Sequence, residues 1–198
     1  LSIGPLSAGT HTVKIVVDTA NALNESNEAD NEYTKTITVG SLNNDVFAYR
    51  ISPDGAFVWG EDGLQLSSGA AFDVSPKVAV TNAGNAVIAW QADDVIIRQK
   101  ISPEGDLLWG DNGITMSGSN TFSWPQLLPV GDDDVIMKFF EDTPPTWAPT
   151  RHVFAQRYDP SGNPVWTQPA VISDAGGISA WTQIFPFIND GNDGFFIA

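Results

Sequence analysis

The sequence predicts an all-β protein in which one hairpin is followed by about three four-stranded units. Three observations lead to this prediction. The first forty residues contain two runs in which apolar and polar residues alternate. A motif with a glycine turn and a tryptophan then occurs three times, at intervals of about fifty residues. Each occurrence is followed by a second hairpin of nearly continuous apolar residues around a tight turn.

The two alternating runs near the start of the chain predict a pair of half-buried strands. In the first run Val13, Ile15 and Val17 share one face, and in the second run Ile37 and Val39 do so. Successive side chains of a strand point to opposite faces, so such alternation buries one face and exposes the other. The polar stretch between the runs joins them into a β-hairpin.

Three short stretches of this segment resemble a known family: Ala-Gly-Thr-His-Thr-Val at 8–13, Glu-Ser-Asn-Glu-Ala-Asp-Asn at 25–31 and Thr-Lys-Thr-Ile-Thr-Val at 34–39. Together they resemble the end of the CARDB family, a cell-adhesion-related, immunoglobulin-like bacterial domain. The resemblance implies that residues 1–40 are the C-terminal hairpin of such a domain and that residues 41–45 are a linker. A complete sandwich of this kind has roughly 100 residues, so most of the domain is expected to precede the first residue.

The connection between these two strands is rich in acidic residues. Asp18, Glu25, Glu28 and Asp30 supply the hard oxygen ligands that calcium prefers. The spacing of an EF-hand loop is missing, and runs of charge are commonly solvated. Two interpretations therefore stand, a solvated hairpin loop and a calcium site, and no other cofactor is expected.

The repeated motif is the strongest pattern in the chain. It begins as Ile51-Ser52-Pro53-Asp54-Gly55, returns as Ile101-Ser102-Pro103-Glu104-Gly105, and returns again as Tyr158-Asp159-Pro160-Ser161-Gly162. A tryptophan lies eight positions after the start of each motif, and a cation precedes it: Trp59, Trp109 and Trp166, and Arg50, Lys100 and Arg157. We expect the tryptophans to lie in the core, and the cations to pair with acids or to lie over a tryptophan face.

Each motif hairpin and the hairpin after it together supply four strands in about fifty residues, which is the size of a propeller blade. The run at 154–166 resembles repeat arrays of large secreted bacterial proteins predicted to be β-propellers. Residues 46–198 are therefore expected to form about three β-propeller-like blades. The array begins and ends with half a blade, and three blades are fewer than the four to eight of closed propellers. We expect an incomplete propeller, completed by further blades of the same chain or by another copy.

Composition limits the possible partners and compartments. The chain has 24 acidic and nine basic residues, a formal net charge of −15, and no cysteine. Such an acidic chain does not attract the phosphates of nucleic acid. A membrane-spanning helix needs a run of about twenty apolar residues, and the sequence has no such run. The acidic, lysine-poor composition is typical of a secreted bacterial protein, so an extracellular or cell-surface location is expected.

One insertion marks a candidate ligand site. The second four-stranded repeat is about eight residues longer than the first repeat, and the extra residues fall in the proline-rich segment 141–151. We expect a stiff loop there that presents Trp147 beside Glu141, Asp142 and Arg151. A rigid tryptophan near carboxylates could stack on a sugar ring or anchor a protein. It could equally pack against a neighbouring blade, because large aromatic residues are mostly buried.

Nothing in the sequence identifies a catalytic centre. The two histidines form no Ser-His-Asp order, and most acids lie in turn motifs where turn chemistry explains them. The expected function is a non-catalytic adhesion, surface-display or scaffold segment of a larger secreted or cell-surface bacterial protein. Its partner would be a protein or glycan on a cell surface or matrix. The alternative is a fragment of a secreted polysaccharide-acting hydrolase, or a glycan-binding propeller.

Overall fold

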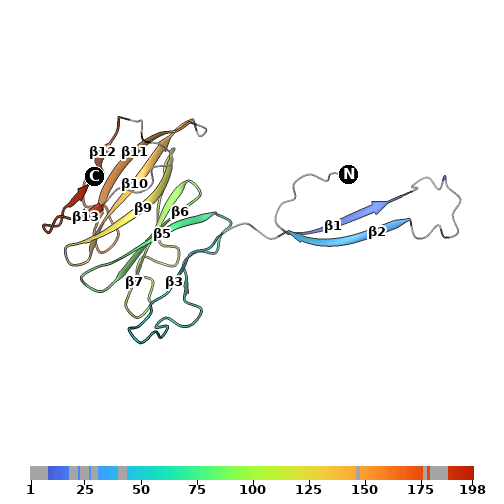
Figure 1. Cartoon of the computed structure of the whole chain (residues 1–198), viewed down its shortest axis with the longest axis horizontal. Helices are drawn as coiled ribbons and strands as arrows, with labels where there is room; N and C mark the ends of the chain where they lie inside the picture. The colour runs from blue at the N-terminus through green and yellow to red at the C-terminus, as the bar shows by residue number, and fades with distance from the viewer. Residues whose placement is uncertain are drawn as a thin grey trace. The chain divides into compact units, whose positions relative to one another are not determined.

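The computed structural model describes residues 9–17, 22, 27, 31–39, 44–145, 148–175, 178 and 187–198. The chain divides into two compact units, Leu1–Leu42 and Asn43–Ala198 (Figure 1). The regular secondary structure of the described residues consists of β-strands, and each strand runs antiparallel to the strand with which it pairs. The predicted all-β class is confirmed.

The first unit contains one hairpin, formed by β1 (Gly9–Val16) and β2 (Glu32–Val39). The pairing is continuous from Gly9 opposite Val39 to Val16 opposite Glu32. The alternating runs therefore form the predicted pair of strands. The predicted immunoglobulin-like character of this unit remains a prediction, because the described residues supply only these two strands.

The second unit contains two four-stranded sheets, each a simple meander in chain order. The first consists of β5 (Asp73–Val80), β6 (Ala86–Ala92), β7 (Val95–Ile101) and β8 (Ile114–Met116). The second consists of β9 (Thr121–Val130), β10 (Asp134–Thr143), β11 (Thr150–Tyr158) and β12 (Ala170–Ser173). In Figure 1 the first sheet is green and the second runs from yellow to red.

A two-stranded sheet flanks this pair of sheets on each side in the sequence. The first is formed by β3 (Phe47–Ala48) and β4 (Leu64–Gln65), and the last by β13 (Phe187–Asn189) and β14 (Phe195–Ile197). The motif lies between β3 and β4, between β7 and β8, and between β11 and β12. It thus connects the third and fourth strands of both four-stranded sheets and the two strands of the first two-stranded sheet. The described part of the second unit therefore has two four-stranded and two two-stranded sheets, none of them closed.

The sheets pack face to face, with an apolar layer on both sides of the central strands. On β6, Ile88 and Trp90 face the β3–β4 hairpin, whereas Val87 and Ala89 face the next sheet. On β10, Val135 and its alternate neighbours face back toward β6. The opposite face of β10 packs toward β13 and β14. The nearly continuous apolar runs in the sequence follow from this burial on two faces.

The predicted loop at 141–151 is strand at both of its ends, where β10 continues to Thr143 and β11 begins at Thr150. The β10–β11 hairpin stays paired as far as Thr143 opposite Thr150. The sequence predicted a stiff loop across 141–151, so this prediction is wrong at both of its ends. The added residues lengthen two strands because they pair with each other across the hairpin, which satisfies their backbone groups.

Candidate functional site

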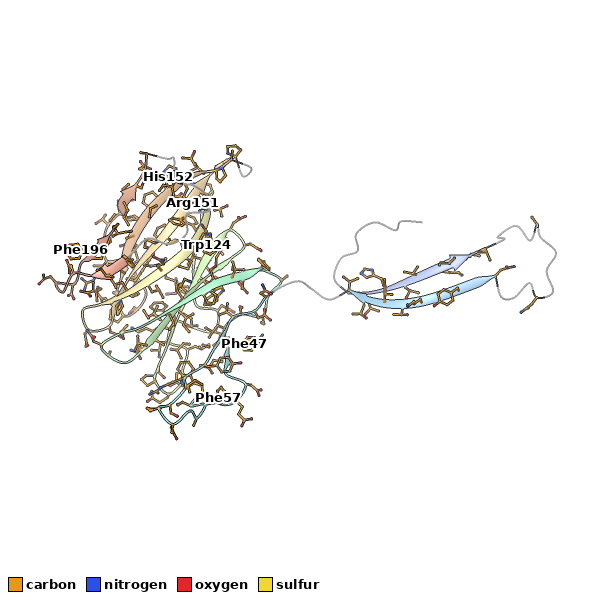
Figure 2. The ribbon with its side chains drawn as sticks, viewed as in Figure 1. Phe47, Phe57, Trp124, Arg151, His152 and Phe196 are labelled. Atoms are coloured by element: carbon orange, nitrogen blue, oxygen red, sulfur yellow. The ribbon has the colours of Figure 1, made fainter. Side chains whose placement is uncertain are left out.

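Three of the four predicted ligand-binding residues, Glu141, Asp142 and Arg151, lie where β10 ends and β11 begins; Figure 2 labels Arg151 there. Asp142 and Arg151 are directly opposite each other in the strand register. Arg151 donates from Nε to Oδ1 of Asp142 at 2.8 Å and from its terminal nitrogen to Oδ2 at 2.6 Å. The guanidinium also lies 4.7 Å from the centre of the Phe140 ring. This two-bond pair is nearly enclosed and fixes the hairpin.

The neighbouring polar residues are also engaged. Glu141 accepts a 2.6 Å hydrogen bond from the Asn120 amide. His152, opposite Glu141 in the register, lies 2.7 Å from the Asp174 carboxylate through its Nδ1. The structure therefore pairs Asp142 with Arg151, whereas Glu141 bonds to Asn120, and a ligand-binding role for these residues remains a prediction. Trp147, the fourth predicted residue, lies outside the described residues.

A hollow of about 410 Å³ lies beside this hairpin end. Its polar lining includes Asp94, Asn120, Thr121, Asp142 and Thr143. Thr121 donates from its hydroxyl to the Asp94 carboxylate at 2.9 Å, so part of the lining is already hydrogen-bonded. Such a surface offers acceptors and hydroxyls, which are the groups that bind sugars and peptide backbones.

The predicted calcium ligands Asp18, Glu25, Glu28 and Asp30 all lie outside the described residues. Within the residues that the structure does describe, no group of three or more His, Asp or Glu side chains is arranged to hold a metal ion.

A second cluster of polar residues joins neighbouring sheets at the repeated motif. The Trp59 indole nitrogen donates to the backbone carbonyl of Pro103 at 3.1 Å, and that of Trp109 donates to the carbonyl of Pro160 at 3.0 Å. Each tryptophan thus bonds to the proline of the next motif along the chain. We call this arrangement the tryptophan joint.

The glycine of the next motif completes the joint. A side-chain carbon built on Gly105 would lie 3.0 Å from Trp59, and one built on Gly162 would lie 3.1 Å from Trp109. Both glycines also have a positive φ that favours glycine. The indole therefore rests against a bare backbone, and the tryptophans are half-buried between sheets.

Two of the three motif cations reinforce this joint. Lys100 forms an ion pair with Asp133 of the next sheet and donates to the Pro160 carbonyl at 3.1 Å, and Arg50 donates to the Pro103 carbonyl. Arg157 instead donates at 2.7 Å to Asp134 on the neighbouring strand of its own sheet. The predicted cation–acid pairs are confirmed for Lys100 and Arg157. The proline carbonyls were missed, because the tryptophan and its acceptor are 44 positions apart in one joint and 51 in the other, so no constant spacing marks them.

Asp133 is the electrostatic centre of one joint. Burial acts to raise the pKa of its carboxyl group, but hydrogen bonds from Asn85, Lys100 and Thr81 outweigh burial and hold that pKa below its ordinary value. The donor distances from Asn85 and Thr81 are 3.0 Å and 2.7 Å. The charged form is therefore the one that the fold binds.

Lys138 has the most strongly shifted pKa. Burial lowers the pKa of its ammonium group to about 8, and its Nζ lies 5.0 Å from the centre of the Phe140 ring. The residue is fully enclosed on β10, so it has no access to a substrate. Its role is structural.

The chain matches no protein-family model, and comparisons with curated proteins and with solved structures find no significant match. The described residues contain no helix with the length and apolar character needed to cross a membrane.

Proposed function

We propose that this chain is a non-catalytic adhesion, surface-display or scaffold segment of an extracellular or cell-surface protein. In this proposal residues 46–198 form propeller-like blades, and residues 1–40 are the end of an immunoglobulin-like domain. The observation that carries it is the tryptophan joint. The joint uses the indole, the cation and the nearby carboxylate to hold one sheet against the next.

The use of the polar side chains supports this proposal. Arg151 and Asp142 bind each other, Lys100 binds Asp133, and the one described histidine of the second unit binds Asp174. Groups held in this way fix a shape and have no free partner for general acid–base chemistry. A net charge of −15 favours solubility in a repetitive extracellular chain.

A glycan-binding module is the second candidate, and the hollow beside the β10–β11 end is the observation that favours it. Asn120 and Thr121 would hydrogen-bond sugar hydroxyls there, with Trp147 as a stacking surface. Calcium at the acidic connection of the first unit would be a separate requirement.

Two measurements test these functions. Labelling of intact producing cells with a reagent that cannot cross membranes should modify the full-length protein. Protection of the protein until the cells are lysed would overturn the extracellular proposal. A glycan array of the purified chain, with and without calcium, should show no sugar-specific binding. Binding that is lost in both Trp147→Ala and Asn120→Ala would establish the glycan function instead.

A further inference from the structure

Within the described residues of the second unit, the β3–β4 end carries an apolar face that no other element of that unit covers. Ile51 is 51% exposed, whereas the residues at the same motif position, Ile101 and Tyr158, are 0% and 3% exposed. Phe47 and Phe57 are also about half-exposed and lie at this end in Figure 2. Ile101 and Tyr158 are covered because they belong to the apolar layers against which Trp59 and Trp109 of the preceding motif pack. Among the described residues, no tryptophan packs in that way on the face around Ile51.

The turn at this end is a vacant acceptor for a tryptophan joint. Gly55 has the same positive φ as Gly105 and Gly162, yet open space surrounds the position of a side-chain carbon. No described residue donates to the Pro53 carbonyl. At the other end of the stack, the Trp166 indole has no carbonyl acceptor among the described residues. The second unit thus has one unused donor and one unused acceptor of the same joint.

The β13–β14 end has a complementary apolar face. Phe196 is 64% exposed, whereas Val87 and Ile136, at the same place in their hairpins, are 1% and 0% exposed. Val87 packs in the layer that includes Leu127 of the next sheet. The residue that matches Leu127 on β5 is Val78, which is exposed. In Figure 2, Phe196 and Phe57 lie on opposite sides of the unit, so one copy does not join these faces to each other.

We infer that a second copy of this chain docks on these faces, with Trp166 of one copy seated on the Pro53–Gly55 turn of the other. Phe196 then covers Val78 of the second copy, as Val87 covers the layer around Leu127 within one copy. This inference rests on the proposed propeller-like stacking. The joint occurs twice inside the chain, with the same residue types as donor and acceptor, and this is the arrangement that the docking repeats.

The docking also supplies the missing halves of two sheets. β14 has an unpaired edge, and so does β3. In the complete sheets, Val87 lies opposite Lys100 and Ile136 lies opposite Arg157. The same register places Phe196 of one copy opposite Arg50 of the other. Unpaired edges are surfaces on which another strand adds readily.

The number of strands favours two copies. The strands from β3 to β14 amount to three four-stranded sheets. Two copies joined head to tail supply six, which falls within the range of roughly four to eight at which rings of such sheets close. Each copy of the 198-residue chain then uses its donor end and its acceptor end once. For residues 1–198 prepared on their own we therefore expect a dimer with twofold symmetry.

Solution mass is the first test. Sedimentation equilibrium of the 198-residue chain at about 0.15 M salt should give twice the chain mass of 21.2 kDa. Ile51→Glu and Trp166→Ala should each raise the dissociation constant of the dimer at least tenfold. Leu108→Glu is the matched control, because Leu108 is similarly exposed but belongs to the β7–β8 connection of a four-stranded sheet and to neither the β3–β4 nor the β13–β14 hairpin. A monomer at all concentrations, or an equal loss of dimer in the control, would overturn the inference.

A cysteine pair tests the register, and the natural chain has no cysteine to interfere. Arg50→Cys and Phe196→Cys chains, prepared separately and mixed under mild oxidation, should give a covalent dimer that contains one of each. Mixing Phe196→Cys with Leu108→Cys should give none. A failed mixture with Arg50→Cys would contradict the docking while leaving the extracellular function intact, because surface labelling tests that function independently.

Discussion

Asp133 illustrates, at the scale of a single residue, how the sheets are tied together. Its carboxylate forms an ion pair with Lys100 of the preceding sheet. It also accepts hydrogen bonds from two neutral side chains, Thr81 and Asn85, in the turn that precedes β6. None of these donors is closer than thirty positions in the sequence. Turn chemistry explains an aspartate at this place, but only the packing of two sheets gives it a charged partner.

Asp133→Asn should lower the free energy of unfolding at pH 7 by about 1–3 kcal/mol, the usual range for hydrogen bonds to a charged group. Because the folded-state pKa is lowered, the carboxylate stabilises the protein above its unfolded-state pKa of about 4. That contribution is lost as the pH falls through the folded-state pKa. Urea unfolding at pH 7 and pH 3 should therefore show a smaller difference in the variant. Asp111→Asn, at an exposed turn, is the control and should leave this difference unchanged.

Lys138→Met tests the effect of a buried cation, for which the free energy of unfolding depends on pH in the alkaline range. The lowered pKa means that the folded state releases its proton near pH 8, whereas the unfolded state keeps it until about pH 10.4. Stability should therefore rise between pH 8 and pH 9.5 in the natural chain, by about 1 kcal/mol, since the unfolded state binds more protons in that range. Unfolding of Lys138→Met should lack this rise. An identical pH profile for both proteins would show that Lys138 is not desolvated.

At the scale of elements, the repeated motif forms the same turn in all three of its occurrences, between β3 and β4, between β7 and β8, and between β11 and β12. Its backbone forms the same hydrogen bonds three times, for example from Ser52 to Ala56, from Ser102 to Asp106 and from Asp159 to Asn163. The sequence indicated this turn because glycine, proline and small polar residues specify turns locally. The length of the β10–β11 hairpin was not indicated, because strand pairing depends on the partner that a segment meets.

Gly162→Ala should destabilise the protein more than Gly55→Ala. A side-chain carbon at position 162 would lie 2.3 Å from Ile114 and 3.1 Å from Trp109, whereas nothing lies within 4 Å of position 55. Both glycines have similar positive φ values, 83° and 87°, so the backbone cost is matched. We expect an additional loss of about 1–3 kcal/mol for Gly162→Ala from overpacking. Thermal unfolding of the two variants, measured where the protein is monomeric, gives the comparison.

At the scale of the whole molecule, the chain is two units, and all the apolar cores found among the described residues belong to the second. The second unit has three apolar layers of its own. The first has a single described hairpin, and an isolated hairpin is marginally stable in water. The stability of the chain should therefore come from the second unit.

A chain of residues 43–198 should fold without the first unit. Its apolar layers lie between strands of that unit alone, so removing residues 1–42 should leave the main thermal transition within about 2 °C. Circular dichroism in the near ultraviolet, which reports the packing of the tryptophans, should be retained. A loss of this signal in the shorter chain would show that the first unit contributes to the core of the second.

The sequence by itself determined the strands, the turns and the position of the repeated motif, because a period of two and the conformational needs of glycine act over a few residues. It also indicated that the motif cations bind acids. Only the tertiary structure decided which residues meet: Trp59 with Pro103, Lys100 with Asp133, and Arg151 with Asp142 across a longer hairpin. These contacts depend on how one sheet lies on the next or on which strand a segment pairs with, and the pattern within a single strand does not encode that choice.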